Sequence, residues 1–172
     1  MKYRIGFVVV LCLSLILLLV KPTVQAAAPT GTLTLSGAAF ICANQVETGS
    51  CPDAEFDPAL GSIQNGQGTW AANVALPPGA VVTALKLCGQ FNEVGSSITA
   101  TLDMAPITAS SGFPSTVAMA SVASTGAADK TQCFATTKIT SPTIHNGSTQ
   151  YFVVVVVPDN DGVIFTSVQI EY

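Results

Sequence analysis

One stretch of the chain decides the fold: Ile98-Thr99-Ala100-Thr101-Leu102-Asp103-Met104. Every second residue in it is apolar, and threonine or aspartate fills the positions between. Because successive side chains of a β-strand point to opposite faces of a sheet, this spacing predicts a half-buried strand. Apolar spacings of three or four, which are typical of amphipathic helices, are much rarer in the chain, so few helices are expected.

Three further segments carry the same alternation and predict strands of the same kind. In residues 164–172, every second residue from Ile164 to Tyr172 is expected to share one side of the sheet. Residues 70–76 form another stripe, which the turn sequence Pro77-Pro78-Gly79 ends, and residues 81–92 restart the pattern.

The stretch Tyr151-Phe152-Val153-Val154-Val155-Val156-Val157 is apolar on both faces. It predicts a central strand that is covered on both sides and ends at Pro158, because an exposed run of this kind promotes aggregation. Shorter strands are expected over residues 32–41, 117–124 and 132–144. About eight or nine short strands without intervening helices predict an all-β fold, a two-sheet β-sandwich that resembles a jelly roll.

The first 26 residues have the pattern of an export signal. Lys2 and Arg4 precede an apolar run over residues 5–20, and small residues follow it. We expect cleavage after Ala26 or Ala28, which makes residues 1–26 a signal peptide and residues 27–172 a single domain. The run is slightly longer than the roughly 7–15 residues of a typical signal, so a retained N-terminal anchor is the alternative. Both alternatives predict a secreted protein, extracellular or periplasmic.

Charged residues are scarce, at 9% of the chain. All ten carboxylates lie beyond residue 26, where Lys86, Lys130 and Lys138 are the strong cations. Phosphate binding depends on lysine and arginine, so we expect no nucleic-acid partner, and no membrane partner once the signal is removed. A glycan, a protein, or a second copy in a homo-oligomer are the partners that the composition permits.

Four cysteines remain beyond the signal: Cys42, Cys51, Cys88 and Cys133. An even number in an exported chain favours disulfides over thiol chemistry. Of the three pairings, we expect Cys42–Cys51, which closes a short loop of turn residues, and Cys88–Cys133, which joins two predicted strands. A metal site is the alternative, but one histidine and the lack of a Cys-x-x-Cys pair argue against it.

Two loops rich in acidic residues are the candidate cation or ligand sites. Oxygen ligands two residues apart are typical of calcium loops, and paired carboxylates can hydrolyse glycosidic bonds. For the second loop, a tight hairpin is the favoured interpretation and a calcium loop is the alternative. No cofactor is expected, and calcium is the alternative. The residues concerned are Asp53, Glu55 and Asp57 after Cys51, and Asp159, Asn160 and Asp161 after the valine run.

Triad catalysis is not expected. His145 is the one histidine and stands in a predicted turn, and no Gly-x-Ser-x-Gly elbow supplies a nucleophile. Trp70, Tyr151 and Phe91 would form a sugar-stacking surface if they were exposed. Their phase in the alternation places Trp70 and Phe91 in the core instead.

Two motifs carry a resemblance to a group of proteins: Leu76-Pro77-Pro78-Gly79-Ala80-Val81-Val82-Thr83 and the closing Val168-Gln169-Ile170-Glu171-Tyr172. With them the chain resembles uncharacterised secreted bacterial β-sandwich proteins that have an LP-x-GA-x-V-T strand-opening motif and a closing V-x-I-x-Y strand. The likeness covers most of the predicted domain and implies its fold. The group has no assigned activity, so the resemblance implies no functional residues.

These observations predict a non-catalytic secreted module, structural or adhesive, whose loops make its contacts. An extracellular carbohydrate-binding or calcium-dependent binding domain is the second hypothesis. A glycan-active enzyme is the third, since it requires two carboxylates to converge in a cleft.

Overall fold

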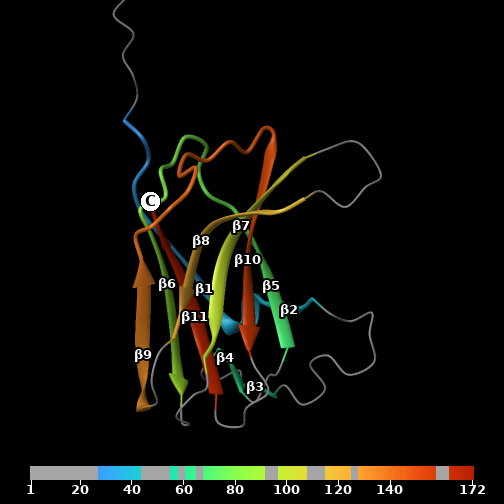
Figure 1. The fold of residues 1–172 in the computed structure, drawn as a ribbon, viewed down its shortest axis with the longest axis vertical. Helices are drawn as coiled ribbons and strands as arrows, with labels where there is room; N and C mark the ends of the chain where they lie inside the picture. Colours follow the sequence, from blue (N-terminus) through green and yellow to red (C-terminus); the bar gives the residue numbers. More distant parts are fainter. Residues whose placement is uncertain are drawn as a thin grey trace, which may run out of the picture.

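The computed structural model of the protein describes residues 27–43, 55–57, 61–64, 68–91, 97–107, 115–124, 128–157 and 163–172. The predicted signal, residues 1–26, lies outside these ranges. Within them, strands dominate (Figure 1), and no helix has the length and apolar character needed to cross a membrane. The elements are β1 (Thr32–Ser36), the 3-10 helix η1 (Gly37–Ala39), β2 (Ile41–Cys42), β3 (Glu55–Asp57), β4 (Ser62–Gln64), β5 (Gly68–Val74), β6 (Ala84–Phe91), β7 (Thr99–Pro106), β8 (Val117–Ala123), β9 (Ala128–Thr136), β10 (Thr149–Val157) and β11 (Val163–Glu171).

The strands form two antiparallel sheets (Figure 1). The five-stranded sheet has the order β2-β5-β10-β7-β8. The six-stranded sheet has the order β3-β4-β11-β6-β9. Its sixth strand, β1, lies on the same side of β11 as β4: β4 pairs with the first half of β11, and β1 pairs with the second half. The structure describes more strands than expected, because β2, β3 and β4 have only two or three residues and are too short to show an alternation.

The strand order is that of a jelly roll. Four antiparallel pairs, β4–β11, β5–β10, β6–β9 and β7–β8, nest inside one another along the sequence like one long hairpin. Rolling this hairpin places β11 beside β6 and β10 beside β7, which produces the two sheets. The predicted all-β sandwich of jelly-roll type is confirmed.

The segment expected to be one strand over residues 32–41 divides between the two sheets. Its first part is β1 in the six-stranded sheet, and its end enters β2 in the five-stranded sheet. Between them, η1 turns the chain where Gly37 lies against β4. A side-chain Cβ at Gly37 would meet the carbonyl oxygen of Gly61 at 2.7 Å, so this close approach requires a glycine.

Alternate residues are buried through most strands, as predicted. Ile98, Ala100 and Leu102 have no exposed surface, and the polar residues between them are half-buried. The stripe over residues 70–76 is buried at every second position. Both sheets therefore turn one face toward a common core, whose largest fully buried side chain is Phe165 of β11.

β11 departs from the predicted phase. Phe165 is fully buried, whereas Ile164 and Thr166 are half-buried. The reason is a β-bulge, because the register against β6 shifts between Phe165 and Ser167. The Thr166 hydroxyl donates to the Cys88 carbonyl at this point, over 2.8 Å. The prediction that every second residue from Ile164 shares one side is therefore wrong before the bulge and holds after it, at Val168 and Ile170.

The predicted disulfide between Cys88 and Cys133 is confirmed. The two residues face each other on β6 and β9, with Cα atoms 4.1 Å apart, so the bond ties the edge strand β9 to its neighbour. Cys42 is also disulfide-bonded. Its expected partner, Cys51, lies outside the described residues, and the Cys42–Cys51 pairing stays a prediction.

Candidate functional site

β10 lies at the centre of the five-stranded sheet, as the valine run predicted. Its outward side chains are not covered as expected, since Phe152 and Val154 are half-buried and Val156 is 45% exposed. Nothing in the described chain packs over them as a third layer, because the sandwich covers only the inner side of each sheet (Figure 1). The prediction of a strand covered on both sides is therefore wrong. Its buried inward residues are Tyr151, Val153, Val155 and Val157.

We define the outer face of the five-stranded sheet by the outward residues of its three central strands. Directly paired residues of antiparallel strands point to the same side, so the pairing register identifies them. Three residues come from each strand, and each is half-buried or exposed. They are Thr69, Ala71 and Asn73 of β5, Phe152, Val154 and Val156 of β10, and Thr99, Thr101 and Asp103 of β7.

One row across this face combines an aromatic ring with two polar groups. Phe152 pairs directly with Asn73 on one side and with Asp103 on the other. Asn73 is exposed, while Phe152 and Asp103 are half-buried. Neighbouring strands are about 4.8 Å apart, so the amide and the carboxylate flank the ring with about 10 Å between their strands. The row therefore offers an apolar surface with hydrogen-bonding groups on both sides.

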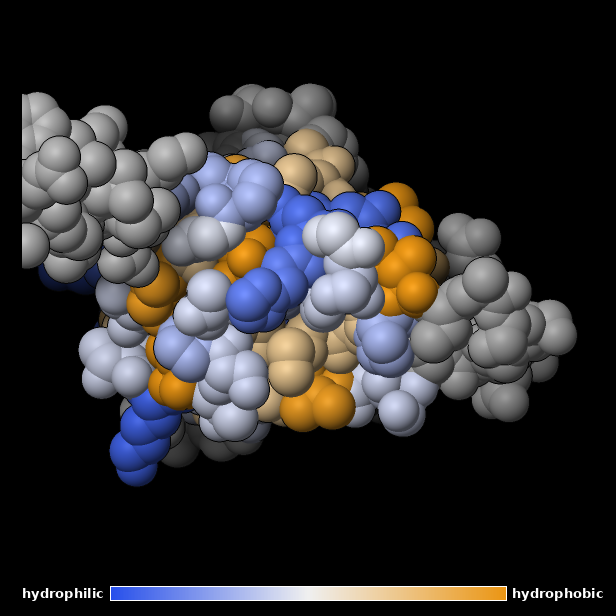
Figure 2. Space-filling model, turned by 90° about the horizontal axis from the view of Figure 1, so that it is seen from above, coloured by the Kyte–Doolittle hydropathy of each residue, from blue (hydrophilic) through white to orange (hydrophobic). Residues whose placement is uncertain are grey.

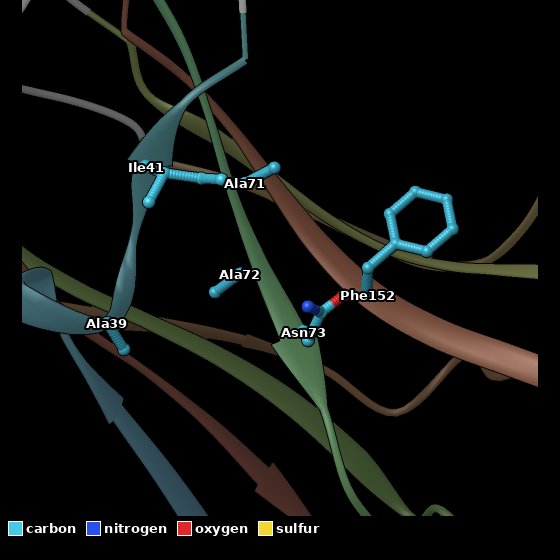
Figure 3. A pocket seen from close by; sticks show the side chains of 6 residues that line it. All are labelled: Ala39, Ile41, Ala71, Ala72, Asn73 and Phe152. Atoms are coloured by element: carbon cyan, nitrogen blue, oxygen red, sulfur yellow. The ribbon is translucent and has the colours of Figure 1, made fainter.

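Asn73 also separates two hollows on this side of the molecule. The first, of about 220 Å³, lies between β2 and β10 and is lined by Ile41, Ala71, Asn73 and Phe152 among others. Figure 3 shows the Phe152 ring projecting from β10, with Asn73 on the adjacent strand and Ile41 opposite on β2. Ile41 is 70% exposed. The described residues that line this hollow have apolar side chains, apart from Asn73.

The second hollow, of about 320 Å³, lies where β5 ends and β10 begins, and its lining includes Asn73, Ile107, Asn146 and Gln150. Figure 2 looks onto this end of the sandwich, where hydrophilic side chains run between hydrophobic ones. The Asn146 amide nitrogen donates to the Leu76 carbonyl over 2.6 Å, which leaves its amide oxygen as an acceptor. Side-chain amides thus dominate the polar groups of this hollow.

The turn beside the second hollow is fixed by hydrogen bonds. The His145 backbone N–H donates to the Tyr151 hydroxyl over 2.8 Å, and residues 146–148 form the turn that leads into β10. His145 itself is exposed. The prediction that this histidine stands in a turn is confirmed.

Asp103 is the charged member of the outer face. On the five strands of this sheet, as the structure describes them, it is the only charged residue. Burial raises the pKa of its carboxyl above the usual 3.8. A β-bulge lies opposite it, because the register between β7 and β8 shifts between Leu102 and Asp103. Bulges commonly redirect a side chain near functional sites.

The raised pKa of Asp103 predicts a pH dependence of stability. The folded state holds this proton more tightly than the unfolded state, so the free energy of unfolding falls as the pH rises from the unfolded value of 3.8 to the raised pKa. Below this window the carboxyl is protonated in both states and has no effect. We expect Asp103→Asn to raise the melting temperature relative to wild type at about pH 7 but not at about pH 3, and thermal melts at both values measure this. An equal difference in melting temperature between the variant and wild type at the two pH values would contradict the prediction.

The acidic loops lie mostly outside the described residues, which exclude Asp53, Asp159, Asn160 and Asp161. Glu55 and Asp57 are the first and last residues of β3. Glu55 pairs with Gln64 of β4, and Gln64 in turn pairs with Ile164 near the start of β11. The strands that follow the two loops therefore start at the same end of the sandwich. In the part of the chain that the structure describes, no three His, Cys, Asp or Glu side chains form a group that could hold a metal ion. The cation site stays a prediction.

Two of the three aromatic residues considered for sugar stacking are buried, and the side chain of the third, Phe91, lies outside the described part of the structure. Trp70 and Tyr151 are 8% and 4% exposed and belong to the core, which confirms the core position expected for Trp70. The ring that points outward on this side is the half-buried Phe152, which the sequence reasoning missed. The signal for it was present, because Tyr151 and Phe152 are adjacent in a strand and must point to opposite faces.

The Leu76–Thr83 motif has a structural part in the fold. Gly79 has a φ of +77°, and the Ala80 N–H donates to the Pro77 carbonyl, as in a type II turn with glycine at its third position. This turn connects β5 in one sheet to β6 in the other and is bonded to Ile144. The resemblance to the secreted bacterial group stays a prediction. No protein-family model and no curated protein matches the chain.

Proposed function

We propose that the protein is a non-catalytic secreted β-sandwich module with a structural or adhesive role, and that it makes its contacts through the outer face of the five-stranded sheet. The observation that carries the proposal is the exposed apolar surface of β10, where Val156 is 45% exposed at the centre of a sheet. Contiguous exposed apolar surface on a folded domain commonly marks an interaction site. The proposal assigns the contacts to a sheet face, whereas the sequence had suggested loops.

The disulfide supports the extracellular part of the proposal. Cys88 and Cys133 are oxidised in adjacent strands, and such bonds persist in oxidising compartments. The outer face also relies on hydroxyl, amide and apolar groups rather than on ion pairs, so its contacts would be only weakly sensitive to salt. Both features suit a protein that works outside the cytoplasm.

Retention of the labelled mature protein on intact cells that secrete it tests the adhesive role. We expect Val156→Lys to reduce retention about tenfold, because a charge at the most exposed apolar residue of β10 must be desolvated on contact. Thr34→Lys is the matched control, since Thr34 is exposed on β1 of the other sheet. Equal retention of the two variants would reject this face as the contact surface. Turnover in a hydrolase panel that one carboxylate substitution abolishes would reject the non-catalytic role.

A carbohydrate-binding domain is the second candidate. The specific observation in its favour is the row Asn73, Phe152 and Asp103, which combines a ring with an amide and a carboxylate. Aromatic and amide side chains are the groups with which proteins contact the apolar and hydroxyl-bearing parts of a ligand.

A further inference from the structure

We propose that Asn73, Phe152 and Asp103 form a subsite for one pyranose ring of an uncharged glycan. The inference rests on the proposed adhesive function and names the ligand of the same face. A sugar ring would stack on Phe152, and its hydroxyl groups would bond to Asn73 on β5 and to Asp103 on β7.

The geometry of the row fits such a ring. Phe152 is paired directly with both polar residues, so the three side chains leave the sheet side by side. With strands about 4.8 Å apart, the two flanking strands are about 10 Å from each other. A pyranose ring with equatorial hydroxyl groups spans most of this width. It therefore places its apolar C–H face on the phenyl ring and its hydroxyl groups over the flanking strands.

The chemistry of the three groups is complementary. Phe152 supplies a flat apolar surface that is already partly buried, so little side-chain freedom is lost on contact. The Asn73 amide both donates and accepts hydrogen bonds, and the oxygens of the Asp103 carboxyl group accept them. Sugar hydroxyl groups can act as both donors and acceptors. The hydroxyl groups of one sugar can therefore form hydrogen bonds with both side chains at once.

The charge distribution of this sheet favours an uncharged ligand. Lys86 lies on β6 and Lys130 on β9, both in the six-stranded sheet, and Lys138 follows β9. No lysine or arginine lies on the five strands of the sheet that carries this face, as far as the structure describes them. Asp103 would repel uronic acids, sulfated sugars and phosphate. A neutral glycan is the carbohydrate that the face accommodates.

The two hollows extend the subsite along β5. The apolar hollow at Ile41 and the amide-lined hollow at Gln150 and Asn146 lie on either side of Asn73. Neighbouring units of a glycan chain would occupy them, so a polymer should bind better than a monosaccharide.

Affinity electrophoresis and calorimetry on the mature protein test the subsite. The probes are neutral polysaccharides, namely a β-glucan, a xylan, a mannan and a galactan, with polygalacturonate as the anionic control. We expect at least one neutral polymer to bind and polygalacturonate not to bind. Phe152→Leu should weaken binding about tenfold, because it keeps the apolar volume and loses the flat ring, whereas Phe152→Tyr should retain it. Asn73→Ala and Asp103→Ala should each weaken binding several-fold, and Thr34→Ala should leave it unchanged.

The outcomes separate this inference from the proposed function. Loss of glycan binding in Phe152→Leu with an unchanged melting temperature supports the subsite. Cell retention that depends on Val156, without binding to any neutral polysaccharide, overturns the subsite and leaves the adhesive role standing. Glycan binding that Phe152→Leu does not affect also overturns the subsite. A dimer in analytical ultracentrifugation that Phe152→Lys dissociates would show that a second copy occupies the face, and would overturn it as well.

Discussion

The double variant Cys88→Ala, Cys133→Ala is expected to lose about 4 kcal/mol of unfolding free energy. The bond joins residues 45 positions apart, and in the chain-entropy model a closed loop of this length restricts the unfolded chain by about that amount. The bond also holds β9, which pairs only with β6 among the described strands. Urea unfolding of the variant and of the wild type without reductant measures the loss.

The control for this prediction is the response to reductant. Wild type should lose stability when the bond is reduced, and the double variant should lose much less, since only the bond at Cys42 remains to be broken. If the double variant unfolded at the same urea midpoint as the oxidised wild type, the prediction would be contradicted. That result would mean that β9 is held by its backbone pairing with β6 alone.

Phe165→Ala is expected to destabilise the fold by about 3–5 kcal/mol. Phe165 has no exposed surface and lies in the middle of the six-stranded sheet, where the loss of its ring would leave a cavity. Its ring also meets that of Phe40 edge to face, with centroids 4.9 Å apart and planes at 88°, which adds about 1 kcal/mol. Urea unfolding measures the effect.

Phe152→Ala is the matched control, because it removes the same ring from the outer face. There the side chain is half-buried, and we expect a loss of only about 1 kcal/mol. A double-mutant cycle between Phe40 and Phe165 should show a coupling of about 1 kcal/mol. Equal losses at Phe165 and Phe152 would contradict the assignment of inner and outer faces.

Much of the fold could be predicted from the sequence because alternation reports directly which side of a strand is buried. It located the strands over residues 70–76, 98–104 and 117–124 and the pairing of Cys88 with Cys133. It failed where backbone geometry, and not side-chain type, determines the outcome. The bulge beside Thr166 shifts the phase of burial between Phe165 and Val168, and the chain crosses between the sheets at Gly37, whereas the prediction assumed one uninterrupted alternation through each segment.

The candidate site was harder to predict for a related reason. The valine run has two apolar faces, and burial of both is the usual interpretation. In the structure only the side that carries Val153 and Val155 is packed, and the sequence contains no sign of which face a second layer covers. The row of Asn73, Phe152 and Asp103 arises from pairing between three strands that are far apart in the chain. It became visible only with the register.

The position of β11 also determines when the protein can fold. It is the last of the described strands along the sequence, yet β1, β4 and β6 all pair with it. The six-stranded sheet therefore lacks its central strand until these nine residues are available. Links between such distant segments give a high contact order and folding on a scale of about milliseconds to seconds. A nascent chain therefore cannot complete this sheet before β11 has been synthesised, which leaves time for chaperones to engage it.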